Sequence, residues 1–447
     1  MSFLQHSLRF SSSHSTIQPF KPHHKPFHHH HIHQVEHQQT YQIPKNGKLK
    51  INLTSSNLIG TSQSRGERPY QEDRISISSI KIKLEEIKQT IKTLGTEAEL
   101  LKRLKPSTVE EFKPIEQTLC IGLFDGHGGS DSSEYLKSNL NQIIESCDPI
   151  EIPNVIRNYR SLGGYFKRFR GGYLEGLGEK MYSIQTPSKS KSKSETQTET
   201  ESKTLRINSP DIELGERLTL AFLKADQHLI TSTPKSGSVG TIVLLNPLPT
   251  NPTSPIYPFY SSPLLLLTIA HVGDTIALLC ESITGKVVPI TETHHPESRV
   301  ESERLRRIGT GLITDSFGES RWGGTLANTR GLGDSRFKKL GVTGEPDIVK
   351  KLLKGDQWSF MVIVSDGVSE VMSNQEIIDL CRTETNPTKA AESIIDFAEK
   401  LGGRDNMTAI IVPFAGWGKV GGIDLTANRR QFRLKQVSNQ SGRQRRM

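Results

Sequence analysis

The stretch Leu119-Cys-Ile-Gly-Leu-Phe-Asp-Gly-His-Gly-Gly129 joins an apolar run to an aspartate that is followed by glycine. The first part of this stretch, 119–124, is typical of a buried strand. Asp125 would therefore lie where that strand reaches the rim of the core. A charge at such a position is costly unless a counter-charge or a cation lies beside it.

Four further acidic groups, two of them next to glycine, are spread along the chain: Glu72-Asp73, Gly273-Asp274, Asp366-Gly367 and Asp405-Asn406. Two of these groups also follow apolar runs, 264–270 and 360–364. Several carboxylates cannot share one rim unless cations neutralise them. Ligand sets made only of oxygen select hard cations, Mg²⁺ or Mn²⁺, over zinc or copper. Carboxylates that hold two such cations are the basis of two-metal hydrolysis of phosphate esters.

Seven segments around these groups resemble the motifs of one enzyme family and occur in the family's order. They are Arg68–Asp73, Phe124–Gly129, Ser236–Thr241, Val272–Asp274, Arg321–Asp334, Val364–Met372 and Gly403–Met407. One Asp-Gly pair is only a turn signal, but seven segments in register are specific. The chain resembles the metal-dependent serine/threonine protein phosphatases of the PPM, or type 2C, family from about residue 60 to residue 414. We expect a fungal-type, mitochondrial member.

The predicted elements indicate an α+β fold. Short apolar runs predict strands over 119–124, 241–245, 264–279, 356–364 and 408–413, and helical spacing predicts helices over 130–147, 216–230, 374–381 and 388–400. Strands in runs, followed by helix pairs, favour antiparallel sheets with helices outside. The resemblance implies the same architecture, a four-layer α-β-β-α sandwich with two central antiparallel sheets flanked by helices.

The resemblance also assigns the metal ligands. Asp125 is the candidate for the carboxylate that bridges two metals. The backbone carbonyl of Gly126 can approach a cation because glycine has no Cβ. Asp366 and Asp405 resemble the other direct ligands of the first metal. The remaining candidates are Asp73, Glu72 (through bound water) and Asp274 (for a third, weaker metal).

The catalytic residues implied by the resemblance are Arg68 and His127. Two metals would lower the pKa of a bridging water and make hydroxide available for in-line attack, with no phospho-enzyme. The planar guanidinium of Arg68 would bind two phosphate oxygens. His127 would protonate the leaving alkoxide. We expect Arg330 and Asp334 to support this machinery structurally.

The sequence departs from the family's pattern at two positions and leaves competing interpretations open. The usual Gly-Asp-Ser-Arg reads Gly273-Asp-Thr-Ile276, and an aspartate four residues past Asp366 is replaced by Glu370. Both changes put the affinity for a third metal in doubt. One alternative is a pseudophosphatase that binds phosphoproteins without turnover. Such a protein would normally lack one of the direct metal ligands, whereas Asp125, Asp366 and Asp405 are all present here. Another is a basic RNA-associated protein, which leaves the glycine-flanked aspartates unexplained.

Composition divides the chain into three parts: 1–50, a transit peptide and His-rich disordered tail; 51–415, a catalytic domain with insertions at about 81–112 and 150–211; and 416–447, a basic tail. The tail holds eight basic residues and one acidic residue, so it carries most of the net charge of +9. We expect it to be solvated and disordered, with docking to an anionic surface or substrate as the alternative. No nucleic-acid partner is expected.

The N-terminal segment predicts mitochondrial targeting. Residues 1–35 contain no Asp or Glu, and Leu4, Leu8 and Arg9 suit an amphipathic presequence. The expected location is the mitochondrial matrix or intermembrane space, with the cytosol as the alternative. The expected partners are phosphoproteins, with mitochondrial matrix enzymes as the candidate class. The four widely spaced cysteines form no zinc or disulfide pattern, and no stretch is apolar enough to span a bilayer.

The two insertions differ in character. Leu84, Ile87, Ile91 and Leu94 recur at helical spacing, which predicts a helix packed outside the core. The second insertion begins with a basic and aromatic stretch, 160–173, which we interpret as a surface loop rather than an RNA-binding or acidic-substrate element. Its later part, 188–203, is low in complexity and predicted to be disordered.

Overall fold

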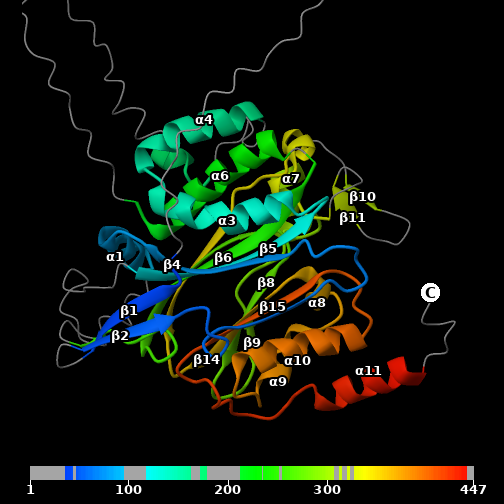
Figure 1. Cartoon of the computed structure of the whole chain (residues 1–447). Helices are drawn as coiled ribbons and strands as arrows, with labels where there is room; N and C mark the ends of the chain where they lie inside the picture. The colour runs from blue at the N-terminus through cyan, green and yellow to red at the C-terminus, as the bar shows by residue number, and fades with distance from the viewer. Residues whose placement is uncertain are drawn as a thin grey trace, which may run out of the picture. The chain divides into compact units, whose positions relative to one another are not determined.

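Figure 1 shows a computed structural model of the chain. It describes residues 36–43, 47–94, 117–162, 172–178, 212–233, 235–250, 254–306, 312–314, 320–322 and 327–439. Segments outside this part include the predicted transit peptide, nearly all of the His-rich run, residues 163–171 of the basic-aromatic stretch, the low-complexity segment 188–203 and the last eight residues. The described residues belong to one compact unit.

The first large sheet has six strands and carries the end of β5 where Asp125 lies. Its strands run in the order β13-β7-β6-β5-β4, with β12 paired to β6, and every pairing is antiparallel. The strands are β4 (Arg74–Lys81), β5 (Gln117–His127), β6 (Gly237–Pro247), β7 (Leu264–Val272), β12 (Leu332–Gly333) and β13 (Asp347–Lys354). The central strands β6 and β7 are buried along their whole length, which explains their continuous apolar sequence.

The second large sheet has five antiparallel strands in the order β3-β15-β14-β8-β9. They are β3 (Gly60–Ser64), β8 (Ile276–Glu281), β9 (Val287–Pro289), β14 (Trp358–Val364) and β15 (Met407–Pro413). Side chains alternate between its two faces. Met361 and Ile363 pack between the sheets, whereas Phe360 and Val362 pack under the helices of the outer layer.

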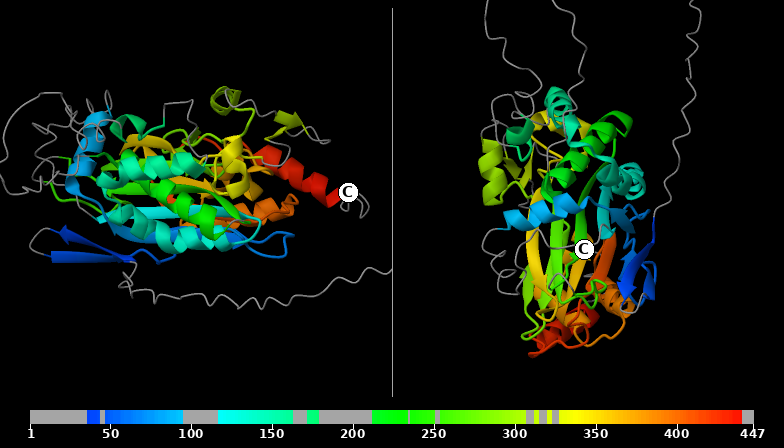
Figure 2. Two further views of the ribbon diagram at one scale, coloured as in Figure 1. Left: turned by 90° about the horizontal axis from the view of Figure 1, so that it is seen from above. Right: turned by 90° about the vertical axis from the view of Figure 1, so that its left-hand side faces the viewer.

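Helices cover the outer face of each sheet, which completes the predicted four-layer α+β sandwich (Figures 1 and 2). The helices of the first side are α1 (Leu84–Thr93), α3 (Asp131–Ser146), α4 (Ile152–Leu162) and α6 (Leu214–Ser232). Those of the second side are α8 (Asp366–Ser369), α9 (Asn374–Cys381), α10 (Pro387–Lys400) and α11 (Ala427–Asn439). A further helix, α7 (Arg299–Arg306), and a hairpin of β10 (Leu312–Thr314) and β11 (Ser320–Trp322) lie between β9 and β12 in sequence.

Two further findings concern the cysteines and the helices. The four cysteines are free and buried. In the described residues, no helix has both the length and the hydrophobicity that a membrane crossing requires.

The prediction of a disordered tail up to residue 50 is wrong at its C-terminal end. Strands β1 (Gln38–Ile43) and β2 (Gly47–Asn52) form an antiparallel hairpin. Tyr41 and Ile51 are nearly fully buried in the core between the sheets. The hairpin segment is rich in Gln and Lys, and its apolar side chains are too sparse to give a clear strand pattern.

The helix predicted in the first insertion forms, but its predicted place outside the core is wrong. Ile87 and Ile91 of α1 are fully buried in the core under the first sheet's helices. Arg217 of α6 is also buried, and its Nη2 donates to Oε1 of Glu86 at 2.6 Å. The buried ion pair and the two buried isoleucines hold α1 against α6. The spacing of apolar residues predicts the helix but not this position in the core.

The second insertion begins with helix α4, which ends at Leu162 and therefore includes the first three residues of the predicted surface loop, 160–173. Val155, Ile156 and Tyr159 of α4 are buried against α6 at i, i+1 and i+4 spacing. Arg160 lies at the end of the helix and pairs with Glu175, which is nearly fully buried. The buried core residues of this helix therefore end at Tyr159, and the helix itself ends at Leu162.

The prediction of a disordered basic tail from residue 416 is also wrong for its described part. Residues 427–439 form α11, whose Leu434 packs against the core under the second sheet. The helix has few apolar residues, so its sequence shows little periodicity. Contacts with the rest of the fold, rather than its own hydrophobic pattern, hold it in place.

Candidate active site

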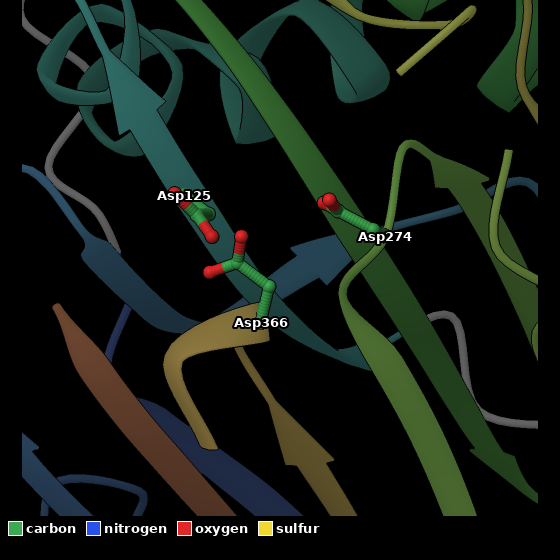
Figure 3. A group of neighbouring side chains, drawn as sticks. All are labelled: Asp125, Asp274 and Asp366. Atoms are coloured by element: carbon green, nitrogen blue, oxygen red, sulfur yellow. The ribbon is translucent and has the colours of Figure 1, made fainter. Parts of the chain in front are cut away.

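Three aspartates from different parts of the chain meet at one end of the sandwich (Figure 3). Asp125 lies at the end of β5, Asp274 follows β7, and Asp366 begins α8 directly after β14. One carboxylate oxygen of each lies within 4.8 Å of the other two. The group thus draws ligands from both sheets, as expected for a site at the junction of the two layers.

The local backbone explains why Asp125 projects into this space. Ser238 of β6 donates from Oγ to the Asp125 carbonyl oxygen at 2.9 Å, and the next residue, Gly126, is opposite Ser238 in the β5–β6 ladder. A Cβ at Gly126 would lie 2.7 Å from the Glu72 carbonyl oxygen. Glycine is therefore required for the strand end to pass this close to the loop that carries Glu72.

Burial and mutual repulsion disfavour the charged forms of the three aspartates. Burial raises the pKa of Asp125 well above its ordinary value, and the charges of Asp366, Asp73 and Asp274 raise it further. The pKa of Asp366 is raised well above its ordinary value for the same reasons, burial first and then the charge of Asp274. The pKa of Asp274 is also raised by burial, although a hydrogen bond from Asn328 opposes the shift. Such a group needs added positive charge to stay ionised at neutral pH.

Unsatisfied oxygens in this region fit bound metal ions. Asp73 is almost fully buried, and its Oδ2 accepts from the Thr408 hydroxyl at 2.6 Å. Its other oxygen, Oδ1, has no hydrogen-bond partner, and neither does Oδ1 of Asp274. Burial raises the pKa of Asp73 to about 6. Orphaned carboxylate oxygens beside an oxygen-only donor set are suited to Mg²⁺ or Mn²⁺.

The other predicted site residues lie around the same cavity of about 860 Å³. Its lining includes Arg68, Glu72, Asp125, Gly126, His127, Asp274, Asp366 and Asp405. Asp73 does not line it and lies behind in the interior. Glu72 accepts a hydrogen bond from the backbone N–H of Gly129 at 2.8 Å through its Oε1. The predicted residues are thus brought together, although they come from segments hundreds of positions apart.

Arg68 and Asp405 form an ion pair at the mouth of the cavity. Nη2 of Arg68 lies 2.6 Å from Oδ2 of Asp405, and the arginine side chain is 57% exposed. Asp405 lies outside the three-aspartate group. Among the described ligand candidates, it is the one that forms an ion pair with an arginine, Arg68. The exposed guanidinium retains free N–H groups that can meet a substrate.

His127 is held by an aspartate that the sequence analysis assigned only a supporting role. Its Nε2 lies 2.8 Å from Oδ1 of Asp334. Burial lowers the pKa of His127, but the charge and hydrogen bond of Asp334 outweigh it, so the pKa lies above its ordinary value. Asp334 is the one described non-glycine residue with positive φ, at 48°. A left-handed conformation at a non-glycine residue marks a constrained position that is often functional. The sequence alone offered only the glycine-rich segment Arg330-Gly-Leu-Gly-Asp334 as a signal.

Asn328 was missed as a site residue by sequence reasoning. Its Nδ2 donates to Oδ2 of Asp274 at 2.7 Å, and both side chains retain a buried oxygen without a partner. Two residues that depart from the family's pattern, Ile276 and Glu370, line the same cavity. Asn328, Ile276 and Glu370 therefore lie in the same cavity as Asp274.

Arg330 lies outside the cavity and forms a separate charge cluster. It donates from Nη2 to Oε1 of Glu301 at 2.7 Å and from Nη1 to Oδ1 of Asp347 at 2.6 Å. Arg304 also pairs with Glu301, at 2.6 Å. The cluster ties α7 to the start of β13, which is a structural role.

Comparisons with known proteins agree with this geometry. The family model described as "Protein phosphatase 2C" matches residues 163–407. "Protein phosphatase 2C homolog 4" of Schizosaccharomyces pombe is 32% identical over 400 residues, which cover 87% of this chain and 89% of that protein. "Protein phosphatase 1K, mitochondrial" of Xenopus laevis is 37% identical over 153 residues, 34% of this chain and 40% of that protein.

Solved structures with similar folds include one described as a serine-threonine phosphatase 2C from Toxoplasma gondii. It has a TM-score of 0.45 and 17% sequence identity, and the match covers 80% of this chain and 94% of that one. The family model and the Schizosaccharomyces pombe relative, by contrast, are matches in sequence over most of the chain. This chain belongs to the protein phosphatase 2C family and is an enzyme, a protein-serine/threonine phosphatase.

Proposed function

We propose that this protein hydrolyses phosphoserine and phosphothreonine in proteins with the help of Mg²⁺ or Mn²⁺. The observation that carries the proposal is the convergence of Asp125, Asp274 and Asp366 with oxygens within 4.8 Å and raised pKa values. Phosphoproteins are the substrates, and the protein phosphatase names of the sequence relatives support that class.

The metal-holding residues we propose are Asp73, Asp125, the Gly126 carbonyl, Asp366 and Asp405, with Glu72 acting through water and Asp274 serving a third ion. When bound, two such ions supply an activated water for attack on phosphorus. The oxygen-only donors and the orphaned oxygens of Asp73 and Asp274 fit this assignment. The contact of Asp274 with Asn328 occupies one of its oxygens, so the third ion would bind most weakly.

Arg68 and His127 are the residues we assign to the substrate. The exposed guanidinium of Arg68 can bind two phosphate oxygens while Asp405 holds its Nη2. Nε2 of His127 donates to Asp334, which leaves Nδ1 as the nitrogen that can give its proton to the leaving alkoxide. Its raised pKa keeps the imidazole protonated nearer to neutral pH.

A phosphopeptide assay with controlled metal tests this function. Activity should appear with Mg²⁺ or Mn²⁺, disappear on exhaustive chelation and return when metal is restored, because oxygen ligands hold exchangeable ions. Full activity after chelation would overturn the two-metal proposal. Metal-dependent phosphopeptide binding without any turnover would instead indicate the pseudophosphatase.

We also propose that the protein is mitochondrial and of the fungal type, and that matrix phosphoproteins are among its substrates. The acid-free segment 1–35 supports this location, as do two relatives whose names include the word mitochondrial. The segment should direct a fused reporter to mitochondria, and Leu8→Pro should abolish import because proline breaks the presequence helix. A reporter that stays in the cytosol with the intact segment would remove the location and leave the enzyme assignment in place.

We retain a central catalytic domain between a targeting segment and a basic C-terminal segment, but we place its borders differently. The hairpin β1–β2 and helix α11 belong to the compact unit, so the domain extends at least from residue 36 to residue 439 rather than from 51 to 415. Limited proteolysis checks these borders, since cleavage should fall outside this range or within the insertions.

A further inference from the structure

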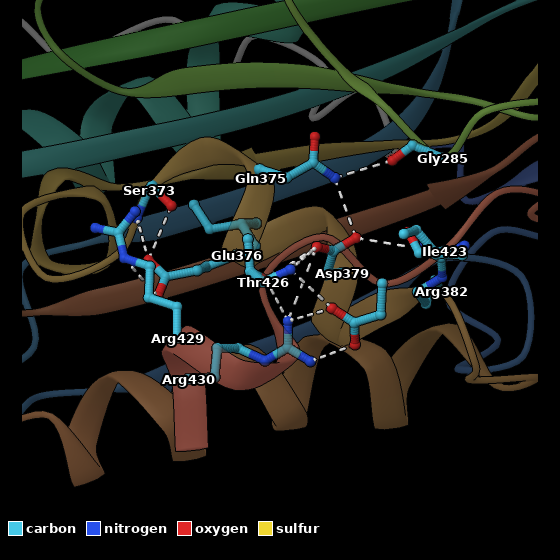
Figure 4. A network of polar contacts seen from close by, with 12 residues as sticks. Gly285, Ser373, Gln375, Glu376, Asp379, Arg382, Ile423, Thr426, Arg429 and Arg430 are labelled. Carbon is cyan, nitrogen blue, oxygen red and sulfur yellow. Dashed lines mark hydrogen bonds and ion pairs between the residues drawn. The ribbon is translucent and has the colours of Figure 1, made fainter. Parts of the chain in front are cut away.

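The basic C-terminal segment is fastened to α9 by arginines and carboxylates (Figure 4). Arg433 of α11 donates from Nη1 to Oε1 and Oε2 of Glu376 at 3.1 and 3.0 Å. Asp379, one turn further along α9, accepts from the backbone N–H and the hydroxyl of Thr426 at 3.0 and 2.9 Å. The match to the family model ends at residue 407, before this segment begins.

The carboxylates of α9 are buried, so these partners matter to the fold. Glu376 is fully buried. Burial raises its pKa, but hydrogen bonds from Ser373 and Arg433 outweigh this, and the pKa lies below its ordinary value. Arg429, by contrast, is 61% exposed and reaches Glu376 only at 3.6 Å. Arg433 is thus the main cationic partner of Glu376.

Arg433 also reaches the segment that carries a candidate metal ligand. Its Nη2 donates to the carbonyl oxygen of Val371 at 2.6 Å. Val371 follows the single turn of α8, which begins with Asp366, and the N–H of Glu370 closes that turn on the Asp366 carbonyl at 2.8 Å. One guanidinium therefore binds both the segment just after α8 and the first turn of α9.

We propose that Arg433 is a positioning residue for the metal site: through Val371 and Glu376 it holds the α8 turn so that Asp366 stays beside Asp125. The inference rests on the proposed function, because it concerns metal binding by Asp366. It gives the C-terminal helix a role in metal affinity rather than in binding an anionic surface.

The need for such a brace follows from the charges at the site. Without metal, Asp366 is repelled by its neighbours, and a four-residue helix offers little stiffness of its own. A carbonyl at a helix end that is bound by an arginine is held better than one left to water. Loss of the brace should let Asp366 move away, which raises the metal concentration required for binding more than it lowers turnover at saturating metal.

The experiment compares Arg433→Met with Arg429→Met in the full chain. Both variants remove one arginine that faces Glu376, but only Arg433 binds Val371. Mn²⁺ binding is measured by calorimetry without substrate, and the Mn²⁺ dependence of activity is measured in parallel. We expect Arg433→Met to weaken Mn²⁺ binding roughly fivefold to tenfold, with kcat at saturating Mn²⁺ within about twofold, and Arg429→Met to leave both unchanged.

A conservative variant and the wild type keep the result interpretable. Arg433→Lys preserves the charge near Glu376, but one ammonium cannot reproduce the guanidinium's contacts to both partners, so an intermediate loss of Mn²⁺ affinity is expected. If Arg433→Met does not fold, the Mn²⁺ affinity of Arg433→Lys tests the inference instead. Unchanged Mn²⁺ affinity with a lower melting temperature would overturn the inference and leave Arg433 purely structural. A wild type that binds no Mn²⁺ would instead overturn the proposed function itself.

Discussion

Two groups of carboxylates in this protein have opposite electrostatic properties. At the site, Asp125 and Asp366 have pKa values raised by burial and by each other. In the cluster beside α7, Glu301 is as deeply buried, but arginines shift its pKa below the ordinary value. Asp347 in that cluster has its pKa lowered to about 2 by His294 and Arg330, despite burial.

The difference shows where the fold supplies its own cations and where it does not. Around α7, Arg330 and Arg304 neutralise Glu301 within the chain. At the site, the largest charges near Asp125 are other carboxylates, so neutralisation must come from outside. The paired charges around α7 stabilise the fold, whereas the unpaired carboxylates of the site favour the binding of a metal cation.

The largest expected effect follows from removing the internal cation of the α7 cluster. Arg330→Met should lower the free energy of unfolding by about 3 kcal/mol, because it removes a cationic partner of the buried Glu301 and a hydrogen bond to Asp347. Chemical denaturation measures this loss. Arg306→Met, a change at an exposed position of α7, is the control and should stay within about 0.5 kcal/mol. A stable Arg330 variant would mean that Arg304 alone neutralises the cluster.

Removing a charge from the site should affect turnover far more than stability. Asp366→Asn should reduce kcat about 100-fold or more, since a metal clamp contributes several kcal/mol to the transition state. The metal-free protein should be as stable as the wild type or more stable, because the raised pKa of Asp366 marks its charge as unfavourable in the fold. Asp356→Asn, in an exposed turn, is the control. Turnover close to that of the wild type at moderate Mn²⁺ would refute the assignment.

Added metal should stabilise the fold through the site carboxylates. Mn²⁺ at about 100 times its Kd should raise the free energy of unfolding of the wild type by about 2.7 kcal/mol. Asp366→Asn should lose most of this gain, and Asp347→Asn should keep it. Melting curves with and without Mn²⁺ check both. Equal gains in the two variants would place the metal elsewhere.

The smallest expected effect concerns the pH dependence of the α7 cluster. The pKa of Asp347 is about 2 in the fold and about 3.9 when unfolded, so its contribution is complete above about pH 4 and is lost as the pH falls towards 2. Asp347 is 47% exposed, which limits the contribution to about 1 kcal/mol. The stability gap between wild type and Asp347→Asn should therefore shrink on acidification. Denaturant titrations at several pH values measure it, and a gap constant down to about pH 2.5 would contradict the cluster's role.

The sequence predicted the fold class and most central elements because their signals are local. The apolar runs of β5, β7 and β14 and the amphipathic spacing of α3 and α6 depend on burial of one face or both. The motif segments also selected the residues that line the cavity. These predictions concern which residues are buried and which chemistry they carry, and neither requires knowledge of a distant partner.

The sequence did not predict α1 as core, the ordered start of the second insertion, the β1–β2 hairpin or α11. The hairpin and α11 contain few apolar residues, so their own patterns are weak. They are held by contacts with distant residues: Tyr41 and Ile51 enter the core between the sheets, and Arg433 binds Glu376. Secondary-structure propensity and hydrophobic periodicity do not predict an element whose stability comes from tertiary contacts.

By itself, then, the sequence determined the family, the order of the layers and the identity of the acidic residues. The tertiary structure alone decided which of those residues meet. Asp125, Asp274 and Asp366 converge because β5 and β7 flank β6 in one sheet while β14 ends beside them in the other. The pairing of His127 with Asp334 is of the same kind, since it joins residues 207 positions apart. Such contacts arise from the packing of whole sheets, and no local pattern encodes them.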